Sequence, residues 1–308
     1  MKKFFLDFYK KHKNKILFFS FLRIVAFIQV LFWPFAFSKV VNIMSDNPEN
    51  WRIAFYWLGA MVINKVLEDL IRIKAKFELE KIGTELEISL ATFFTERTEL
   101  RKDKKTGESV QAIKRASENI NSLIEFYKDN LLKLPVNLII IPIIFLRVNL
   151  SYLGLLIIYG VLYLIIDYSL LKLYRQKVQD SFRAAEIFWG TTYRKTPEVW
   201  RQREDGYTFA KTVDQEGKDL YKKEVVANRI NMIRWAVLQA FSSATIGGVI
   251  LFVLDKVIKN ITPIGNLILI SGYFREMQGT LNIITSTFTR ITDTRISLKR
   301  LSKAVKIK

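Results

Sequence analysis

Six long apolar segments, separated by charged stretches, are the feature that most constrains this chain. Each is about 20 residues long or longer, which is the length that a helix needs to cross a bilayer core about 30 Å thick. We expect six transmembrane helices, over residues 16–44, 51–73, 131–148, 151–173, 230–254 and 261–284. The sequence therefore predicts an all-α membrane protein.

The distribution of positive charge predicts how these helices are oriented. The chain carries 48 Lys and Arg residues against 29 Asp and Glu residues, a net charge of +19. Most of the basic residues lie before residue 16, after residue 289, or in two long connections over residues 74–130 and 174–229. Basic flanks stay on the cytoplasmic side. We expect a multi-pass protein of the cell membrane with both termini and both long connections in the cytoplasm.

The two long connections have the pattern of helices and not of loops. No proline occurs between Trp51 and Thr98, and apolar residues recur there at helical spacing. The second span is therefore expected to continue beyond the membrane for a total of roughly 65 Å. The same pattern covers residues 108–146 and 151–195, with chain reversals at residues 98–109 and 191–206. These two tips are candidate docking elements for a cytoplasmic partner, although a stalk of helices packed only on one another is the alternative.

Composition argues against several other classes of protein. The chain has no cysteine and only one histidine, His12, so we expect no disulfide, no metal site and no catalytic constellation. The basic residues flank apolar spans instead of sharing a face with exposed aromatic residues, so no nucleic-acid partner is expected.

Three ionisable residues are expected near the middle of the membrane, where charge is costly and is usually functional or paired. They are Lys65 in the second span and Arg275 and Glu276 in the sixth. Our hypothesis is that Lys65 pairs with Glu276 while Arg275 faces a translocation cavity and favours an anionic or amphipathic cargo. A static ion pair without any role in cargo binding is the alternative.

Other charged residues in the spans lie closer to their cytoplasmic ends. For Arg23, Glu68 and Asp69, pairing or extension of the side chain toward the headgroups is a sufficient explanation. Pro34 removes a backbone hydrogen bond and is expected to kink the first span.

Small residues recur at every fourth position of the fifth span, namely Ala240, Ala244 and Gly248. Small residues at this spacing allow two helices to approach closely in a membrane. We interpret them as a packing face, and one that a second subunit could share.

The whole chain resembles the transmembrane domain of type I ABC exporters. The resemblance begins with a basic elbow at residues 1–15 and includes Pro34 in the first span. The segment TGESVQAIKRASENINSLI resembles the stretch that follows the family's first coupling helix. The segment from Thr262 to Leu301 is similar to the sixth helix, ending in the Arg-Leu pair that usually leads into the ATPase domain.

The resemblance implies two coupling helices, near residues 96–105 and 193–203, that would dock on an ATPase. The second of these departs from the family pattern, since the usual Glu and Gly are not evident and Pro197 interrupts it. The residues expected to carry this contact are Glu99, Arg101, Lys102, Tyr193, Arg194, Glu198, Trp200 and Arg201.

No G-x-x-x-x-G-K-[ST] phosphate-binding loop occurs in the sequence. We therefore expect a basic elbow over 1–15, a transmembrane domain over 16–304, a short basic tail over 305–308 and no ATPase domain. ATP and Mg²⁺ would be bound by a separate nucleotide-binding subunit. Because one copy supplies six spans and the family's pathway has twelve, a homodimer or a heterodimer is implied. A membrane scaffold or regulatory subunit that retains the exporter fold is the alternative function.

Overall fold

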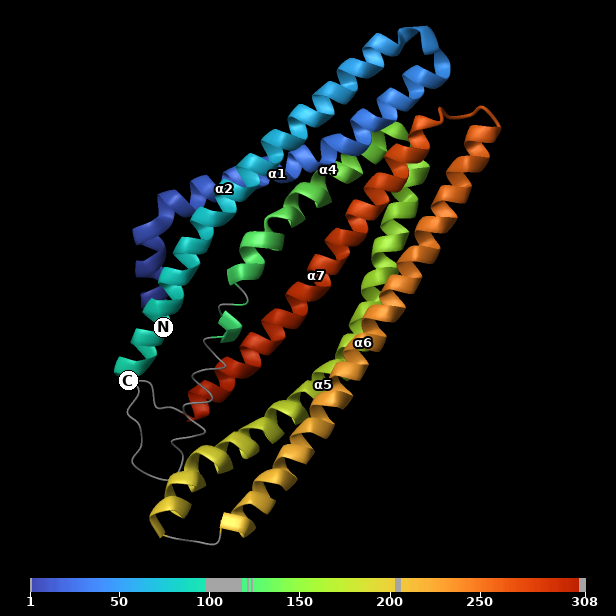
Figure 1. Ribbon diagram of the computed structural model, residues 1–308. Helices are drawn as coiled ribbons and strands as arrows, with labels where there is room; N and C mark the ends of the chain where they lie inside the picture. Colours follow the sequence, from blue (N-terminus) through green and yellow to red (C-terminus); the bar gives the residue numbers. More distant parts are fainter. Residues whose placement is uncertain (1, 98–117, 121, 123, 203–205, 305–308) are drawn as a thin grey trace. The chain divides into compact units, whose positions relative to one another are not determined.

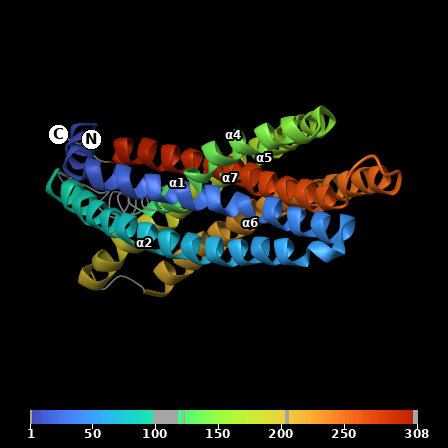
Figure 2. The ribbon, with the colours of Figure 1, turned by 90° about the horizontal axis from the view of Figure 1, so that it is seen from above.

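The computed structural model describes residues 2–97, 118–120, 122, 124–202 and 206–304, and these residues form helices with no strand among them. Figures 1 and 2 show the helices from two directions. The all-α prediction is confirmed. In chain order the elements are α1 (Lys2–Asp46), the 3-10 turn η1 (Pro48–Asn50), α2 (Trp51–Arg97), the π-helical turn η2 (Tyr127–Leu131), α4 (Lys133–Val148), α5 (Leu150–Gln202), α6 (Gly206–Ile258) and α7 (Gly265–Ala304).

The predicted spans fall on these long helices. By length and composition, four helical stretches in the described residues are apolar enough to cross a membrane: Lys3–Asp46, Glu118–Val148, Leu150–Ala185 and Ala210–Ile258. Helices α2 and α7 are not among them, because charged and polar residues interrupt their apolar runs. The chain is thus a multi-pass membrane protein.

Several helices are much longer than a membrane span requires. Helices α5 and α6 each contain 53 residues, which corresponds to roughly 80 Å. Helix α5 continues to Gln202 and α6 begins at Gly206, so α5 passes through residues 191–202, which the sequence predicted to be part of a reversal. At the other end of the chain, the predicted basic elbow forms the first turns of α1, which runs unbroken from Lys2 to Asp46.

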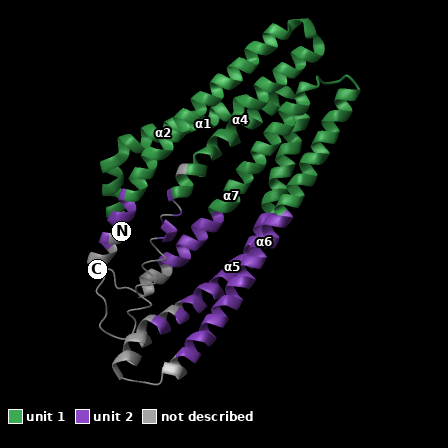
Figure 3. Ribbon diagram, in the orientation of Figure 1, with its two compact units in different colours: residues 1–84, 125–165, 238–287 green, residues 85–124, 166–237, 288–308 purple. Residues whose placement is uncertain are grey.

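The chain divides into two compact units, each assembled from distant segments (Figure 3). The first unit contains residues 1–84, 125–165 and 238–287, and the second contains residues 85–124, 166–237 and 288–308. Each unit has its own buried side chains and is described separately below.

In the first unit, α1 and α7 are in close contact at Pro34. A Cβ atom placed on Gly272 would lie 2.8 Å from the Cβ of Pro34, so only glycine fits there. One residue further, the Tyr273 hydroxyl donates a 2.8 Å hydrogen bond to the backbone carbonyl of Leu31. At the first residue of α7, the Gly265 amide donates a hydrogen bond of 2.7 Å to the Asn42 side chain on α1. Glycines in α7 therefore set how closely this helix approaches α1.

Buried polar side chains join the remaining helices of the first unit. The Asn137 amide on α4 donates to the Thr280 hydroxyl on α7 at 2.8 Å, and both residues are fully buried. The Tyr159 hydroxyl on α5 lies 2.8 Å from the hydroxyl of Ser242 on α6. Since unpaired polar groups are costly at such depth, these bonds fix the register of neighbouring helices.

The second unit is held by a buried ion pair. The Arg234 guanidinium on α6 donates to the Asp167 carboxylate on α5 at 2.7 Å and to the Thr289 hydroxyl on α7 at 3.1 Å. The exposed fractions of Arg234 and Asp167 are 0% and 2%. This arrangement ties three helices together through one cation, and removing either charge would leave the other buried without its partner.

Candidate functional site

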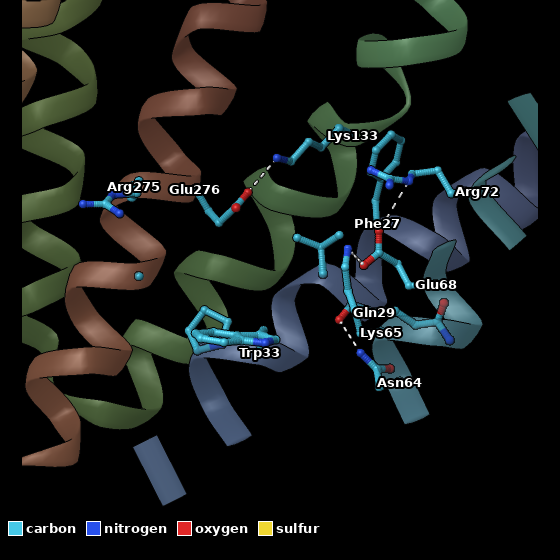
Figure 4. Close-up of a pocket in the computed structure, with 13 residues that line it drawn as sticks. Phe27, Gln29, Trp33, Asn64, Lys65, Glu68, Arg72, Lys133, Arg275 and Glu276 are labelled. Carbon is cyan, nitrogen blue, oxygen red and sulfur yellow. Dashed lines mark hydrogen bonds and ion pairs between the residues drawn. The ribbon is translucent and has the colours of Figure 1, made fainter. Parts of the chain in front are cut away.

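Among the residues that the structure describes, a cavity of about 550 Å³ in the first unit is a candidate ligand site. Four helices contribute to its wall, and Figure 4 shows the side chains. Helix α1 supplies most of the apolar surface, while α2, α4 and α7 supply the charged groups. The lining residues are Phe27, Gln29, Val30, Trp33, Pro34, Asn64, Lys65, Glu68, Arg72, Lys133, Gly272, Arg275 and Glu276.

The three ionisable residues singled out in the sequence all line this cavity, but the pairing predicted between two of them is wrong. The ammonium group of Lys65 lies 2.7 Å from Glu68 and 3.3 Å from Asp69, on its own helix. Acids three and four positions along a helix lie on the same face as the lysine and are within its reach. Glu276 is therefore left to pair with a residue of another helix.

Glu276 forms an ion pair with Lys133, which the sequence reasoning missed. The Lys133 ammonium group on α4 lies 2.6 Å from the Glu276 carboxylate on α7, and the two side chains point toward each other in Figure 4. Lys133 begins α4, and one residue, Leu132, separates it from the turn η2. The only signal in the sequence was a lysine placed immediately before a long apolar run, which by itself is typical of a headgroup contact.

Glu68 is the buried centre of a charged cluster on α2. Its side chain is only 3% exposed, and it lies between Lys65 and Arg72, whose guanidinium is 3.6 Å away. Arg72 also donates to Asp69 at 2.6 Å. The expectation that Glu68 and Asp69 are paired is confirmed, and the pairing offsets the cost of a carboxylate in an apolar environment.

A second charged cluster joins α1, α2 and η2. The buried Arg23 lies 3.4 Å from the Asp129 carboxylate, and Lys76 lies 3.4 Å from the same oxygen. Arg23 also donates to the backbone carbonyl of Arg72 and stacks over the ring of Phe27, a cavity residue. Arg23 is therefore paired, as the sequence suggested, and its partner Asp129 is placed by a π-helical turn, a feature that is frequent near functional sites.

Arg275 differs from the other cations of the cavity wall. Its side chain is exposed, and it forms no hydrogen bond or ion pair with any residue in the described part of the chain. In Figure 4 it is directed away from Lys133 and Glu276. Arg275 thus adds a positive charge to the site without a compensating carboxylate.

The row of small residues on α6 is exposed in the first unit. Ala240, Ala244 and Gly248 are all accessible, and a Cβ atom on Gly248 would meet no other atom within 4 Å. Within the described residues, no helix of this chain packs against Gly248. The packing face predicted from the sequence remains available for a partner.

The described residues that line this cavity include none of those expected to contact an ATPase. Glu99, Arg101 and Lys102 lie outside the described residues. The remaining five fall on the last turns of α5, and their side chains lie outside the described part of the structure: Tyr193, Arg194, Glu198, Trp200 and Arg201.

A comparison with solved structures shows that the helices are arranged in a known membrane-protein fold. A solved structure of a bacterial Atm1-family ABC exporter with ATP bound superposes on 95% of this chain with a TM-score of 0.80 and 12% sequence identity. The chain spans about half of that exporter, covering 53% of its length. No family model matches the sequence, and no curated protein sequence matches it. The structural comparison shows that this chain has the ABC exporter transmembrane fold.

Proposed function

We propose that this chain is the transmembrane subunit of an ATP-driven exporter. The observation that carries the proposal is the exporter fold, which extends over 95% of the chain. Helices of 53 residues are long enough both to cross a bilayer and to extend well into the aqueous phase. Rigid helices of this length suit a mechanism in which the movement of a soluble partner tilts the transmembrane bundle.

The source of energy in this proposal is a separate nucleotide-binding subunit that binds ATP and Mg²⁺. These 308 residues contain no phosphate-binding loop, so nucleotide binding is assigned to residues outside them. Two contact regions are proposed, one around Glu99, Arg101 and Lys102 and the other on the last turns of α5. In this proposal six helices of the chain cross the cell membrane, and both termini lie in the cytoplasm with the two contact regions.

The proposed complex contains two transmembrane subunits, either two copies of this chain or this chain with a related one. The exposed row of small residues on α6 supports such an association, because it would allow a second helix to approach closely.

The proposal is tested by purifying the tagged chain from its native membranes and measuring vanadate-sensitive ATP hydrolysis in the complex. We expect the chain to carry an ATPase with it, and combined alanine replacement of Glu99, Arg101 and Lys102 to lower the co-purified activity about tenfold through loss of the docking contact. Alanine replacement of Asp214 and Lys218, an exposed ion pair on α6, is the matched control. The variant chains must remain in the membrane at the normal level.

A complex that hydrolyses ATP and is stimulated by a cargo supports an exporter. A stable complex without any nucleotide turnover would instead indicate a scaffold or regulatory subunit that has kept the fold. Activity that the three alanine replacements leave unchanged would contradict the proposed docking region.

A further inference from the structure

The wall of the cavity is divided into an apolar part and a charged part. Helix α1 contributes Phe27, Val30, Trp33 and Pro34 to the apolar part. The charged groups come from the other three helices. A ligand that fits both parts has an apolar body and a polar or charged group at one end.

The charged groups of the cavity largely neutralise one another within the structure. Lys65 and Arg72 lie against Glu68 and its neighbour Asp69 at distances between 2.6 and 3.6 Å. Lys133 lies against Glu276 at 2.6 Å. These contacts leave both groups of charges, the one on α2 and the one between α4 and α7, close to electrical neutrality.

Arg275 is the charge that this pairing does not balance. It lines the cavity, and in the described residues no carboxylate approaches it within ion-pair distance. A guanidinium without a partner carboxylate attracts an anion and repels a cation, and this effect weakens with distance and with salt. The cavity therefore favours a negative ligand over a positive one.

The size of the cavity limits the ligand further. A volume of about 550 Å³ is in the range of pockets that enclose one drug-sized molecule. It suits a compact molecule and not a long peptide or a folded domain.

We propose that this cavity binds a drug-sized amphipathic monoanion, with its apolar body against α1 and its acidic group toward the positive excess on α7. Ligand binding in this cavity does not require the proposed exporter function. The proposal rests on that function only when binding is interpreted as the first step of transport. Binding itself is measurable without any ATPase.

The test uses two probes that share a body and differ in the sign of their charge, 4-(1-pyrenyl)butanoate and 4-(1-pyrenyl)butylammonium. Binding is measured by isothermal titration calorimetry on the protein in lipid nanodiscs, with empty nanodiscs as the blank. We expect the butanoate to bind and the ammonium compound to bind at least about tenfold more weakly, although the ammonium compound has one more CH₂ group of apolar surface.

Two substitutions of adjacent residues are expected to act in opposite directions. Arg275→Gln removes the excess charge and should weaken butanoate binding about tenfold, whereas Glu276→Gln releases Lys133 and should strengthen it. Arg147→Gln is the matched control, because Arg147 is an exposed arginine on α4 that does not line the cavity.

Equal affinity for both probes, or butanoate binding that Arg275→Gln leaves unchanged, would overturn the proposal. Arg275 has no partner in the described residues, so its replacement is not expected to disturb folding, and gel filtration of each variant checks this. If the protein does not discriminate between the two probes but still forms an active ATPase complex, only the proposed ligand site is refuted. Retained selectivity without any ATPase partner refutes the exporter function alone.

Discussion

At the scale of single residues, Asp293 is a carboxylate of the second unit whose surroundings disfavour its charged form. It lies on α7 beyond the predicted end of the sixth span and is partly buried. Burial raises the pKa of the Asp293 carboxyl to about 6, although the charges of Arg290, Arg175 and Arg234 act in the opposite direction. In the folded protein this group therefore binds a proton more tightly than an unfolded aspartate, whose pKa is near 3.8.

This difference predicts how stability depends on pH. Between about pH 4 and pH 6 the folded state holds a proton that the unfolded state has released, so stability should fall as pH rises through this range. Asp293→Asn removes the ionisation and should stabilise the protein by about 2 kcal/mol at pH 7. Thermal melting of the detergent-solubilised protein at pH 5 and pH 7 measures the effect.

From pH 5 to pH 7, the melting temperature of the natural sequence should drop more than that of the Asp293→Asn variant. Asp180→Asn, at an exposed position on α5, is the control and should show the natural pH dependence. The same pH profile for Asp293→Asn and the natural sequence would mean that Asp293 is as well solvated in the folded state as in the unfolded one.

At the scale of helices, the contact between α1 and α7 depends on the absence of a side chain at Gly272. Gly272→Ala would place a Cβ atom 2.8 Å from the Cβ of Pro34, and a proline ring has no rotamer by which it could move aside. Overpacking of this kind costs about 1–3 kcal/mol. We expect a lower melting temperature, measured in detergent by intrinsic fluorescence.

Gly279→Ala is the matched control on the same helix. A Cβ atom at Gly279 meets nothing within 4 Å, so this change should be neutral or stabilising by up to about 1 kcal/mol through helix propensity. Equal effects of the two substitutions would indicate that α1 and α7 are not in close contact at Pro34.

At the scale of the whole molecule, the exposed face of α6 predicts the site of association with a second transmembrane subunit. The natural chain contains no cysteine, so Gly248→Cys introduces a single reactive thiol. Oxidation or a short bifunctional maleimide in native membranes should join the thiols of two copies, or the thiol of one copy to a cysteine of a different subunit, because small residues bring the partner helix close to this position. The mass of the product, measured by mass spectrometry, separates two copies from a pair of different subunits.

Gly160→Cys on α5 is the control, since a Cβ atom there also meets nothing within 4 Å but the position is outside the α6 row. We expect far less product from it. Cross-linking at Gly160 and not at Gly248 would place the subunit contact on another helix.

Much of the architecture follows from the sequence by itself. Long apolar runs bounded by charge determined the helical class and the approximate position of the long helices, because a helix is the segment that satisfies its own backbone hydrogen bonds in a membrane. The absence of proline from Trp51 to Thr98 likewise predicted that α2 continues to Arg97. Such signals are local, and helix formation depends largely on residues that are close together in the sequence.

The partners of the charged residues were decided only by the tertiary structure. The sequence identified Lys65, Arg275 and Glu276 as residues of one site, yet Lys65 pairs within α2, and Glu276 pairs with Lys133. An ion pair depends on the rotation of each helix about its axis and on its register against its neighbours. These are set by contacts such as Gly272 against Pro34, between positions 238 residues apart in the chain, which no local pattern records.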